Sequence, residues 1–413
     1  MRSRARGGAE RKWGKWAPAG AALLLVMAGL VLAREAVAQE LSAARLRSKA
    51  AIVIDAHTGR VLFESNAHEP LPPASVTKVM TMLLVLEAIQ EGRLQWDDTV
   101  TASARARSMG GTQIWLETGE TMSVRDLLYA VALGSANDAA VALAEHLAGS
   151  EEAFAQWMNR RAAELGARNT RFSNASGLPP ESLGMAGQEH VTSAYDLAMI
   201  SRQAVQTPGF LELVSFYGPY PIRPGTSKLV ELWNLNHMLR TYRGMDGIKT
   251  GMTRAAGWCL SATAVRDGLR LIAVVLGAPS RDERTADVRT LLDWGFAHFR
   301  AHRFAEEGAE AGTVPVAKGE RERVRATVAT ELVAAVPRDR SVTTETRIEW
   351  DPAPAAPVAA GQRLGRMRAY VDGEVVGEAD VVAAEAVPRA SAVTLAVRAI
   401  RDVVGVLSGP VYR

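Results

Sequence analysis

Residues 72–78 are the segment that most constrains the fold of this chain. The segment opens with two prolines, at positions 72 and 73, and is followed by an apolar run to residue 90. Proline has no N–H to donate, so the two prolines end the strand or loop before them, and the run that follows is compatible with a buried helix. Ser75 and Lys78 would then lie on one helix face, one turn apart. A hydroxyl beside an amine is a nucleophile with a candidate base, although a helix cap with a solvated lysine gives the same pattern.

Two further short patterns follow at long separations. The tripeptide Ser-Ala-Asn at residues 135–137 begins sixty residues after Ser75, in a tight turn predicted between two helices. The tripeptide Lys-Thr-Gly at residues 249–251 begins 171 residues after Lys78, just before a predicted pair of antiparallel strands. Each triplet is common by itself, but the three patterns in this order and at these separations are specific.

With these patterns the chain resembles the serine D-alanyl-D-alanine carboxypeptidases, the low-molecular-weight penicillin-binding proteins. The likeness extends past the triplets into five longer blocks, at residues 73–81, 134–140, 169–177, 244–251 and 274–278. It covers roughly residues 45–305, which are expected to form the catalytic domain, and the β-rich segment that follows looks like the second domain of that family. The resemblance implies an α+β fold of the β-lactamase and transpeptidase type.

The resemblance also implies a reaction with the stem peptide of peptidoglycan. Ser75 Oγ is expected to attack the carbonyl of the penultimate D-Ala and form an acyl-enzyme, and β-lactam antibiotics are expected to be covalent inhibitors. Lys78 must be neutral for part of the time to accept the proton, and burial together with the cation of Lys249 would lower its pKa. Ser135, with Lys249 alongside, can pass a proton to the leaving amine, and the amide of Asn137 can hold Lys78 and the substrate backbone.

Substrate recognition is expected around the Lys-Thr-Gly triplet. Lys249 and the hydroxyl of Thr250 suit the free carboxylate of the terminal D-Ala, and Gly251 would let the substrate lie close to the strand. By resemblance, the N–H groups of Ser75 and Met252 form the oxyanion hole. Met252 stands where the family often has threonine or histidine, which leaves its side-chain contacts open but not the contribution of its N–H.

A cation downstream of the strand pair is expected to steer the substrate carboxylate. Arg284 matches by spacing an arginine that the family uses, with Arg281 as its neighbour, and a solvated arginine at a helix start is the alternative for Arg284. No metal or cofactor is expected, because the seven histidines show no metal-ligand spacing and His146 and His190 are isolated in the sequence.

Residues 1–38 have the three parts of a signal peptide. Residues 2–15 are basic and residues 19–33 form an apolar run. The small residues Ala36 and Ala38 then occupy the two positions that a signal peptidase inspects. We expect export and cleavage after Ala38, with an uncleaved N-terminal anchor as the alternative. The leader carries a net charge of +5 and the whole chain +3, so the rest is about −2 and gives no reason to expect nucleic-acid binding.

Strand-like and helical patterns predict one antiparallel sheet beside a helical subdomain. Residues 50–65 indicate a hairpin, and residues 75–148 are mostly helical. Two more strands are expected at residues 257–265 and 269–276, followed by a helix at residues 281–299. Strands occur at both ends of the helical middle, so both ends of the domain are expected to feed the same sheet.

After the catalytic domain the sequence changes to short β-like runs separated by Gly, Pro and charged turns, which predicts a small all-β domain over residues 306–388. Residues 389–413 indicate an amphipathic helix whose apolar face includes Val393, Val397 and Ile400. This helix could bind a membrane surface, or it could pack on its own domain or on a partner.

A serine β-lactamase shares all three patterns and is the first alternative. The common class uses a glutamate in a Glu-x-x-Leu-Asn loop about 36 residues past the serine of its Ser-x-Asn pattern, where this chain has Arg171. A non-catalytic wall-binding protein is the second alternative, and the intact triplets argue against it. The preferred interpretation is an exported enzyme, secreted or at the extracytoplasmic face of the membrane, that trims D-Ala from peptidoglycan.

Overall fold

The structure, a computed structural model, describes residues 46–338 and 340–407, with side chains described up to residue 401. The predicted signal peptide, residues 1–38, lies outside the described residues. From Arg47 onward the chain forms one compact unit. The fold is α+β, as the sequence predicted.

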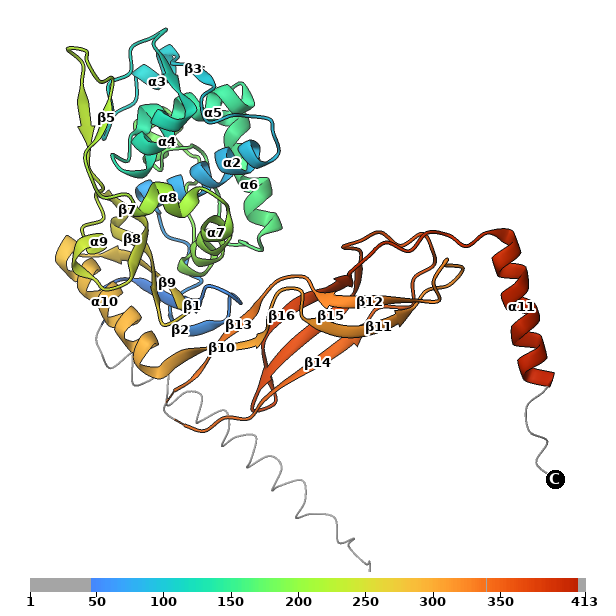
Figure 1. The fold of residues 1–413 in the computed structure, drawn as a ribbon. Helices are drawn as coiled ribbons and strands as arrows, with labels where there is room; N and C mark the ends of the chain where they lie inside the picture. The colour runs from blue at the N-terminus through green and yellow to red at the C-terminus, as the bar shows by residue number, and fades with distance from the viewer. Residues whose placement is uncertain (1–45, 339, 408–413) are drawn as a thin grey trace, which may run out of the picture. The chain divides into compact units, whose positions relative to one another are not determined.

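A five-stranded antiparallel sheet organises the N-terminal part of this unit, up to residue 298 (Figure 1). β1 pairs with β9 in a register that places Ile52 opposite Val274. Both ends of the N-terminal part therefore feed one sheet, as predicted, and β7 is an edge strand of that sheet. The strand order is β2-β1-β9-β8-β7, with the bounds β1 (Ala50–Asp55), β2 (Val61–Ser65), β7 (Met245–Thr253), β8 (Gly257–Arg266) and β9 (Leu269–Ala278).

The two faces of the sheet pack against different layers, because successive side chains of a strand point to opposite faces. Ile52 belongs to the main hydrophobic core, which the sheet shares with the helices. Val53 and Leu271 face the other layer, formed by α10 (Arg281–His298). A Cβ at Gly295 would lie 2.5 Å from Leu271 Cδ1, so this glycine allows α10 to lie directly on the sheet.

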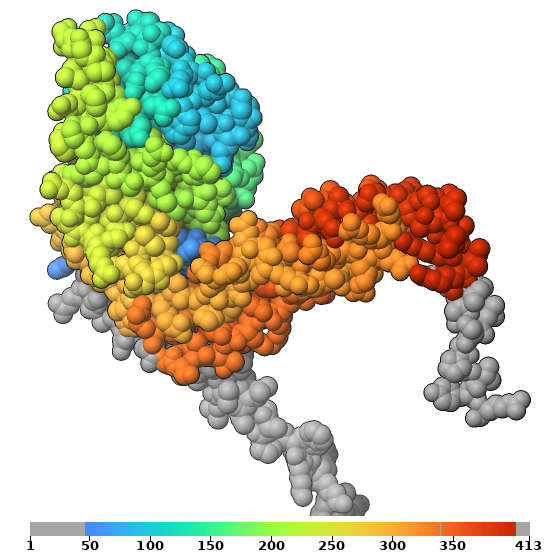
Figure 2. Space-filling model, in the orientation of Figure 1, coloured from blue at the N-terminus to red at the C-terminus, as the bar shows by residue number. Residues whose placement is uncertain are grey.

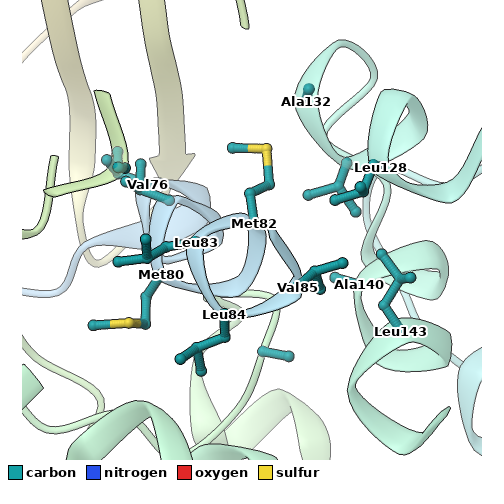
Figure 3. Close-up of a cluster of buried hydrophobic side chains, with 14 of the residues drawn as sticks. Val76, Met80, Met82, Leu83, Leu84, Val85, Leu128, Ala132, Ala140 and Leu143 are labelled. Carbon is teal, nitrogen blue, oxygen red and sulfur yellow. The ribbon is translucent and has the colours of Figure 1, made fainter. Parts of the chain in front are cut away.

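Helix α2 (Lys78–Gln90) runs through the main core and is buried on nearly every side. A helix that is apolar all round needs neighbours on all faces, and α4 (Val124–Ala132) and α5 (Asn137–Ala148) supply two of them. Figure 3 shows Val85 of α2 beside Ala140 of α5. This packing fixes the start of α2, where Lys78 lies.

The remaining elements of the N-terminal part are mostly short. The pairs β3–β4 and β5–β6 join strands of three residues, too short for an alternating pattern, and they were not predicted. In Figure 2 the yellow-green region, which contains β5 and β6, lies beside the teal region. Arg223, which follows β5, donates to the carbonyl of Ile114 in the segment before β4. The bounds are η1 (Ala74–Thr77), β3 (Thr99–Thr101), α3 (Ala104–Arg107), β4 (Thr121–Ser123), α6 (Glu151–Glu164), η2 (Pro180–Leu183), α7 (Ala194–Gln206), α8 (Phe210–Ser215), β5 (Tyr220–Ile222), β6 (Val230–Leu232) and α9 (Met238–Thr241).

The C-terminal part consists of strands around a separate apolar core, and this confirms the predicted all-β region. One sheet has the order β11-β12-β16-β15-β14, and β10 pairs with β13. The predicted boundary at residue 305 assigns β10 to the catalytic domain, but β10 pairs with β13, which belongs to the C-terminal part. Because α10 continues directly into β10, the sequence has no turn there that could indicate a domain boundary. The domain boundaries stay predictions. The strands are β10 (Phe299–Ala305), β11 (Glu310–Pro315), β12 (Arg323–Val328), β13 (Leu332–Pro337), β14 (Thr344–Trp350), β15 (Arg363–Val371) and β16 (Glu374–Ala383).

Helix α11 (Ala392–Leu407) has the predicted amphipathic character. Its Val393, Val397 and Ile400 side chains are 74%, 61% and 65% exposed. Arg398 donates to the carbonyl of Gly319 at 2.6 Å, so the polar side of the helix contacts the β part while this apolar face is exposed. Within residues 46–338 and 340–407, no helix combines the length and the apolarity that crossing a bilayer requires.

Candidate active site

Ser75 lies in η1, the 3₁₀ turn between the double proline and α2, and its side chain is half-buried. The turn lies between β7 and the loop that contains Gly177. A Cβ at Gly251 would lie 2.9 Å from the carbonyl oxygen of Pro73, and a Cβ at Gly177 would lie 1.9 Å from that of Ala74. Glycine at both positions therefore allows the turn with the serine to fit between its neighbours.

The reason predicted for Gly251 needs correction. Gly251 does line the cavity described below. However, the space where its side chain would stand is filled by η1, with Val76 Cγ2 only 2.9 Å from a Cβ, and is not open to a substrate. The missing side chain thus serves the packing of the serine turn.

Lys78 is fully buried at the start of α2, and its amine makes three contacts. Nζ lies 3.1 Å from Ser75 Oγ, 2.6 Å from Asn137 Oδ1 and 2.6 Å from the carbonyl oxygen of Ser176. Burial, and after it the cation of Lys249, hold the pKa of Lys78 well below its ordinary value. The direction and both causes are those predicted from the sequence.

Ser135 and Asn137 occupy the turn that leads into α5. Ser135 has a left-handed φ of +57°, an uncommon conformation for a residue other than glycine, and its side chain is buried. The Asn137 amide accepts from Lys78 and donates from Nδ2 to the carbonyl of Gly110 at 2.6 Å. The adjacent Asp138 carboxylate accepts the N–H of Ile114, which ties the turn to the segment before β4.

Lys249 and Thr250 lie on β7, the strand that packs against the serine turn η1. Lys249 is buried, and its Nζ lies 3.2 Å from the carbonyl oxygen of Thr250. Burial, and after it the cation of Arg284, lower the pKa of Lys249 to about 7. The Met252 side chain is 52% exposed at the rim, where it can make few fixed contacts.

Arg284 lies in the first turns of α10 and is buried, which excludes the alternative of a solvated arginine at a helix start. Its guanidinium carbon lies 5.6 Å from the ring centre of Trp258. Burial, and after it the neighbouring cation of Arg281, lower the pKa of Arg284 to about 10. Arg281 also lines the cavity but is exposed.

A cavity of about 400 Å³ brings the predicted residues together. Lys78 and Lys249 lie behind its wall, each in contact with a lining residue. Among the side chains that the structure describes, Ser135 Oγ and Arg284 Nε are the buried polar atoms without a hydrogen-bond partner, and both residues line this cavity. The lining residues are Ser75, Gly111, Thr112, Ser135, Asn137, Leu178, Leu235, His237, Thr250, Gly251, Met252, Thr253, Trp258, Arg281 and Arg284.

Sequence reasoning missed the residues that support Lys78 from behind. The carbonyl of Ser176 accepts from the lysine amine, and the carboxylate of Glu151 accepts the N–H of Ala175 beside it. His190, isolated in the sequence, is buried with Nε2 2.8 Å from Thr77 Oγ1. The family-like block at residues 169–177 indicated that this loop is important. The contact of the Ser176 carbonyl with Lys78 could not be predicted, because every residue type has a backbone carbonyl.

Comparison with known proteins relates both the N-terminal and the C-terminal part of the chain to penicillin-binding proteins. The family described as D-alanyl-D-alanine carboxypeptidase matches residues 36–280, and the C-terminal domain of penicillin-binding protein 5 matches residues 299–389. The D-alanyl-D-alanine carboxypeptidase DacF of Bacillus subtilis is 37% identical over 356 residues, which are 86% of this chain and 90% of that protein. DacD of Escherichia coli is 33% identical over 82% of this chain and 87% of its own length.

Solved structures agree in fold. Penicillin-binding protein 5 from Haemophilus influenzae superposes with a TM-score of 0.67 at 28% identity, over 84% of this chain and 98% of that one. Penicillin-binding protein D2 from Listeria monocytogenes, in its ampicillin-bound form, superposes with a TM-score of 0.53 at 36% identity, over 61% of this chain and 98% of that one.

The fold is therefore that of the penicillin-binding proteins. Within this class the chain belongs to the D-alanyl-D-alanine carboxypeptidase family, the serine type, which confirms the resemblance stated from the sequence.

Proposed function

We propose that Ser75 is the nucleophile with which this carboxypeptidase removes the terminal D-Ala from peptidoglycan pentapeptides. The observation that carries the assignment is the environment of the Lys78 amine. A neutral amine has two N–H groups and one lone pair. With Asn137 Oδ1 and the Ser176 carbonyl each accepting one N–H at 2.6 Å, the lone pair is left for the hydroxyl of Ser75. Lys78 is then the general base for acylation.

In the acylation step a bond forms between Ser75 Oγ and the carbonyl carbon of the penultimate D-Ala, and the bond from that carbon to the terminal D-Ala nitrogen breaks. The proton of Ser75 passes to Lys78 and is then relayed through the hydroxyl of Ser135 to the leaving amine, which returns Lys78 to its neutral form. Ser135 Oγ is buried without a protein partner among the described residues. Water then hydrolyses the ester and releases the tetrapeptide. The N–H groups of Ser75 and Met252 are proposed to stabilise the oxyanion.

Arg284 is proposed to bind the carboxylate of the terminal D-Ala, together with Lys249 and Thr250. Its buried Nε has no partner among the described side chains, and an unpaired buried donor at a cavity suits an anionic ligand. Gly251 and Met252 would line the same subsite by their backbone. The substrate class is therefore a peptide with a free C-terminal carboxylate.

The test of the nucleophile compares Ser75→Ala with Ser108→Ala, which alters an exposed serine that does not line the cavity. Release of D-Ala from a pentapeptide and labelling by fluorescent penicillin should both disappear in Ser75→Ala and persist in Ser108→Ala. Release that survives in Ser75→Ala would refute the assignment.

We also propose that β-lactams acylate Ser75, since the Listeria relative was solved in ampicillin-bound and cefotaxime-bound forms. The lifetime of the penicillin adduct separates this proposal from the β-lactamase alternative. A carboxypeptidase should keep the adduct for much longer than seconds, whereas loss of the adduct within seconds would favour the lactamase.

We propose that the protein is exported by its leader, acts outside the cytoplasm and binds the membrane surface through α11. Support comes from the exposed Val393, Val397 and Ile400 on one helix face. Flotation with anionic liposomes should recover the full chain but not a variant without residues 391–413. Equal flotation of both would contradict the membrane role.

A further inference from the structure

His190 lies buried between the turn that carries the proposed nucleophile and the loop that supports Lys78. Its Nε2 is 2.8 Å from Thr77 Oγ1, and its Nδ1 is 3.1 Å from the backbone nitrogen of Ser173. The ring also packs against Phe172, with 5.7 Å between ring centres. A single imidazole thus contacts both segments that meet at the Lys78 amine.

The tautomer of His190 follows from its partners. The backbone N–H of Ser173 can only donate, so Nδ1 is the acceptor. The neutral ring then carries its proton on Nε2 and donates it to Thr77 Oγ1. Burial, and after it the cation of Lys78, lower the pKa of His190 to about 3, so the ring is neutral near neutral pH.

The loop at residues 173–177, on the other side of His190, positions the Ser176 carbonyl. Asn174 Oδ1 accepts the N–H of Ser176 at 3.1 Å and that of Gly177 at 2.7 Å, which closes a tight turn. This turn directs the Ser176 carbonyl at Lys78 Nζ, 2.6 Å away. Displacement of the turn would therefore remove one of the two acceptors that orient the lysine amine.

We propose that His190 is a positioning residue for acylation: it joins Thr77 to the loop at residues 173–177 and so holds the Ser176 carbonyl against the Lys78 amine. His190 does not touch the substrate. It fixes the direction of the lone pair that the Ser75 hydroxyl meets. This inference rests on the proposed role of Lys78 as the base.

The test uses a set of matched variants. Thr77→Val removes the acceptor of the His190 proton with little change of volume, and Thr77→Ser retains it. His190→Ala removes the imidazole, and His146→Ala is its control, because that histidine is exposed. For each variant, kcat and KM for D-Ala release from a pentapeptide are measured, and kcat is expressed per molecule that saturating fluorescent penicillin can label.

Thr77→Val and His190→Ala should each lower kcat per labelled molecule by roughly 10- to 100-fold, with KM little changed, because a small displacement of the base slows the chemical step. The double variant should be no slower than the slower single variant, since both changes break the same link. Thr77→Ser and His146→Ala should behave as the wild type.

Unchanged kcat per labelled molecule in both single variants would overturn the inference, as would losses that multiply in the double variant. Misfolding alone would reduce the number of labelled molecules but not their kcat, and this result would also overturn it. A wild-type enzyme that releases no D-Ala would overturn the proposed function and this inference with it, whereas an active wild type with unaffected variants overturns the inference alone.

Discussion

At the scale of single residues, the site depends on two buried lysines whose contacts are with neutral oxygen atoms. The amine of Lys78 meets a hydroxyl, an amide oxygen and a carbonyl, and that of Lys249 meets a carbonyl. Burial disfavours a cation in such surroundings, so an amine that is ordinarily protonated becomes available as a base.

The first prediction concerns the pH dependence of acylation. Only neutral Lys78 can accept the proton of Ser75, so the rate of labelling by fluorescent penicillin should rise with pH as Lys78 loses its proton. Because the pKa of Lys78 is lowered, this rise should be complete well below the ordinary value of 10.5. Labelling rates measured from about pH 5 to about pH 10 would check it, and a rise that continues to the top of this range would show an unperturbed lysine.

A second prediction separates the two arginines at the cavity. Arg284→Met should lower kcat/KM by on the order of 10- to 100-fold for a peptide with a free C-terminal carboxylate, because a charge-assisted contact in a buried site is lost. The effect should shrink for the C-terminally amidated peptide. Arg281→Met is the control, with a smaller effect expected because that side chain is exposed. The reverse order of effects would assign the carboxylate to Arg281.

At the scale of elements, the position of Ser75, the proposed nucleophile, is set by how closely η1 packs on β7. A Cβ at Gly251 would stand 3.0 Å from the backbone nitrogen of Val76, the residue after Ser75. Backbone atoms cannot yield as a flexible side chain can, so a larger residue on β7 has to move the turn. The geometry of the serine is therefore a property of two elements far apart in sequence.

Gly251→Ala should accordingly slow penicillin labelling strongly and destabilise the fold by about 1–3 kcal/mol, the usual cost of overpacking. Gly110→Ala provides a matched control close to the cavity, because a Cβ there meets nothing within 4 Å. Labelling rates and thermal unfolding of both variants test this. A wild-type labelling rate in Gly251→Ala would mean that η1 can accommodate a Cβ at position 251 without moving Ser75.

The elements that the sequence predicted well are those with long patterns. The hairpin β1–β2, the strands β8 and β9 and the helices α2 and α10 each carry enough residues for periodicity or a turn to identify them. The three-residue strands carry no such signal. The triplets located Ser75 and Lys78, whereas the contacts of His190 and of the Ser176 carbonyl arise from tertiary packing and could not be predicted from residue type or spacing.

At the scale of the whole molecule, Asp55 connects the N-terminal and C-terminal parts. Its carboxylate accepts from Thr58 Oγ1 at 2.9 Å and from the backbone N–H of Ala335, on β13, at 2.8 Å. The side chain is fully buried, so each of these donors depends on it. The turn after β1 is thereby bonded to a strand of the all-β part.

Asp55→Ala should lower the free energy of unfolding by about 1–3 kcal/mol, because it leaves a buried N–H without an acceptor, while D-Ala release stays near the wild-type rate. Asp97→Ala is the control: that side chain is 85% exposed in its ion pair with Arg125, and such pairs contribute little. Denaturant unfolding compares the variants. Equal free energies of unfolding for Asp55→Ala and Asp97→Ala would show that the hydrogen bond from Ala335 to Asp55 does not stabilise the protein.

The central claim is that η1, the start of α5 and strand β7 come together so that Lys78 can deprotonate Ser75. Mass spectrometry of proteolytic fragments after reaction with penicillin tests it most directly. We predict one covalent adduct, on the fragment that contains Ser75, and none on the same fragment from a Lys78→Met variant treated for the same time. An adduct on a different serine, or full labelling of Ser75 without the lysine, would contradict the account.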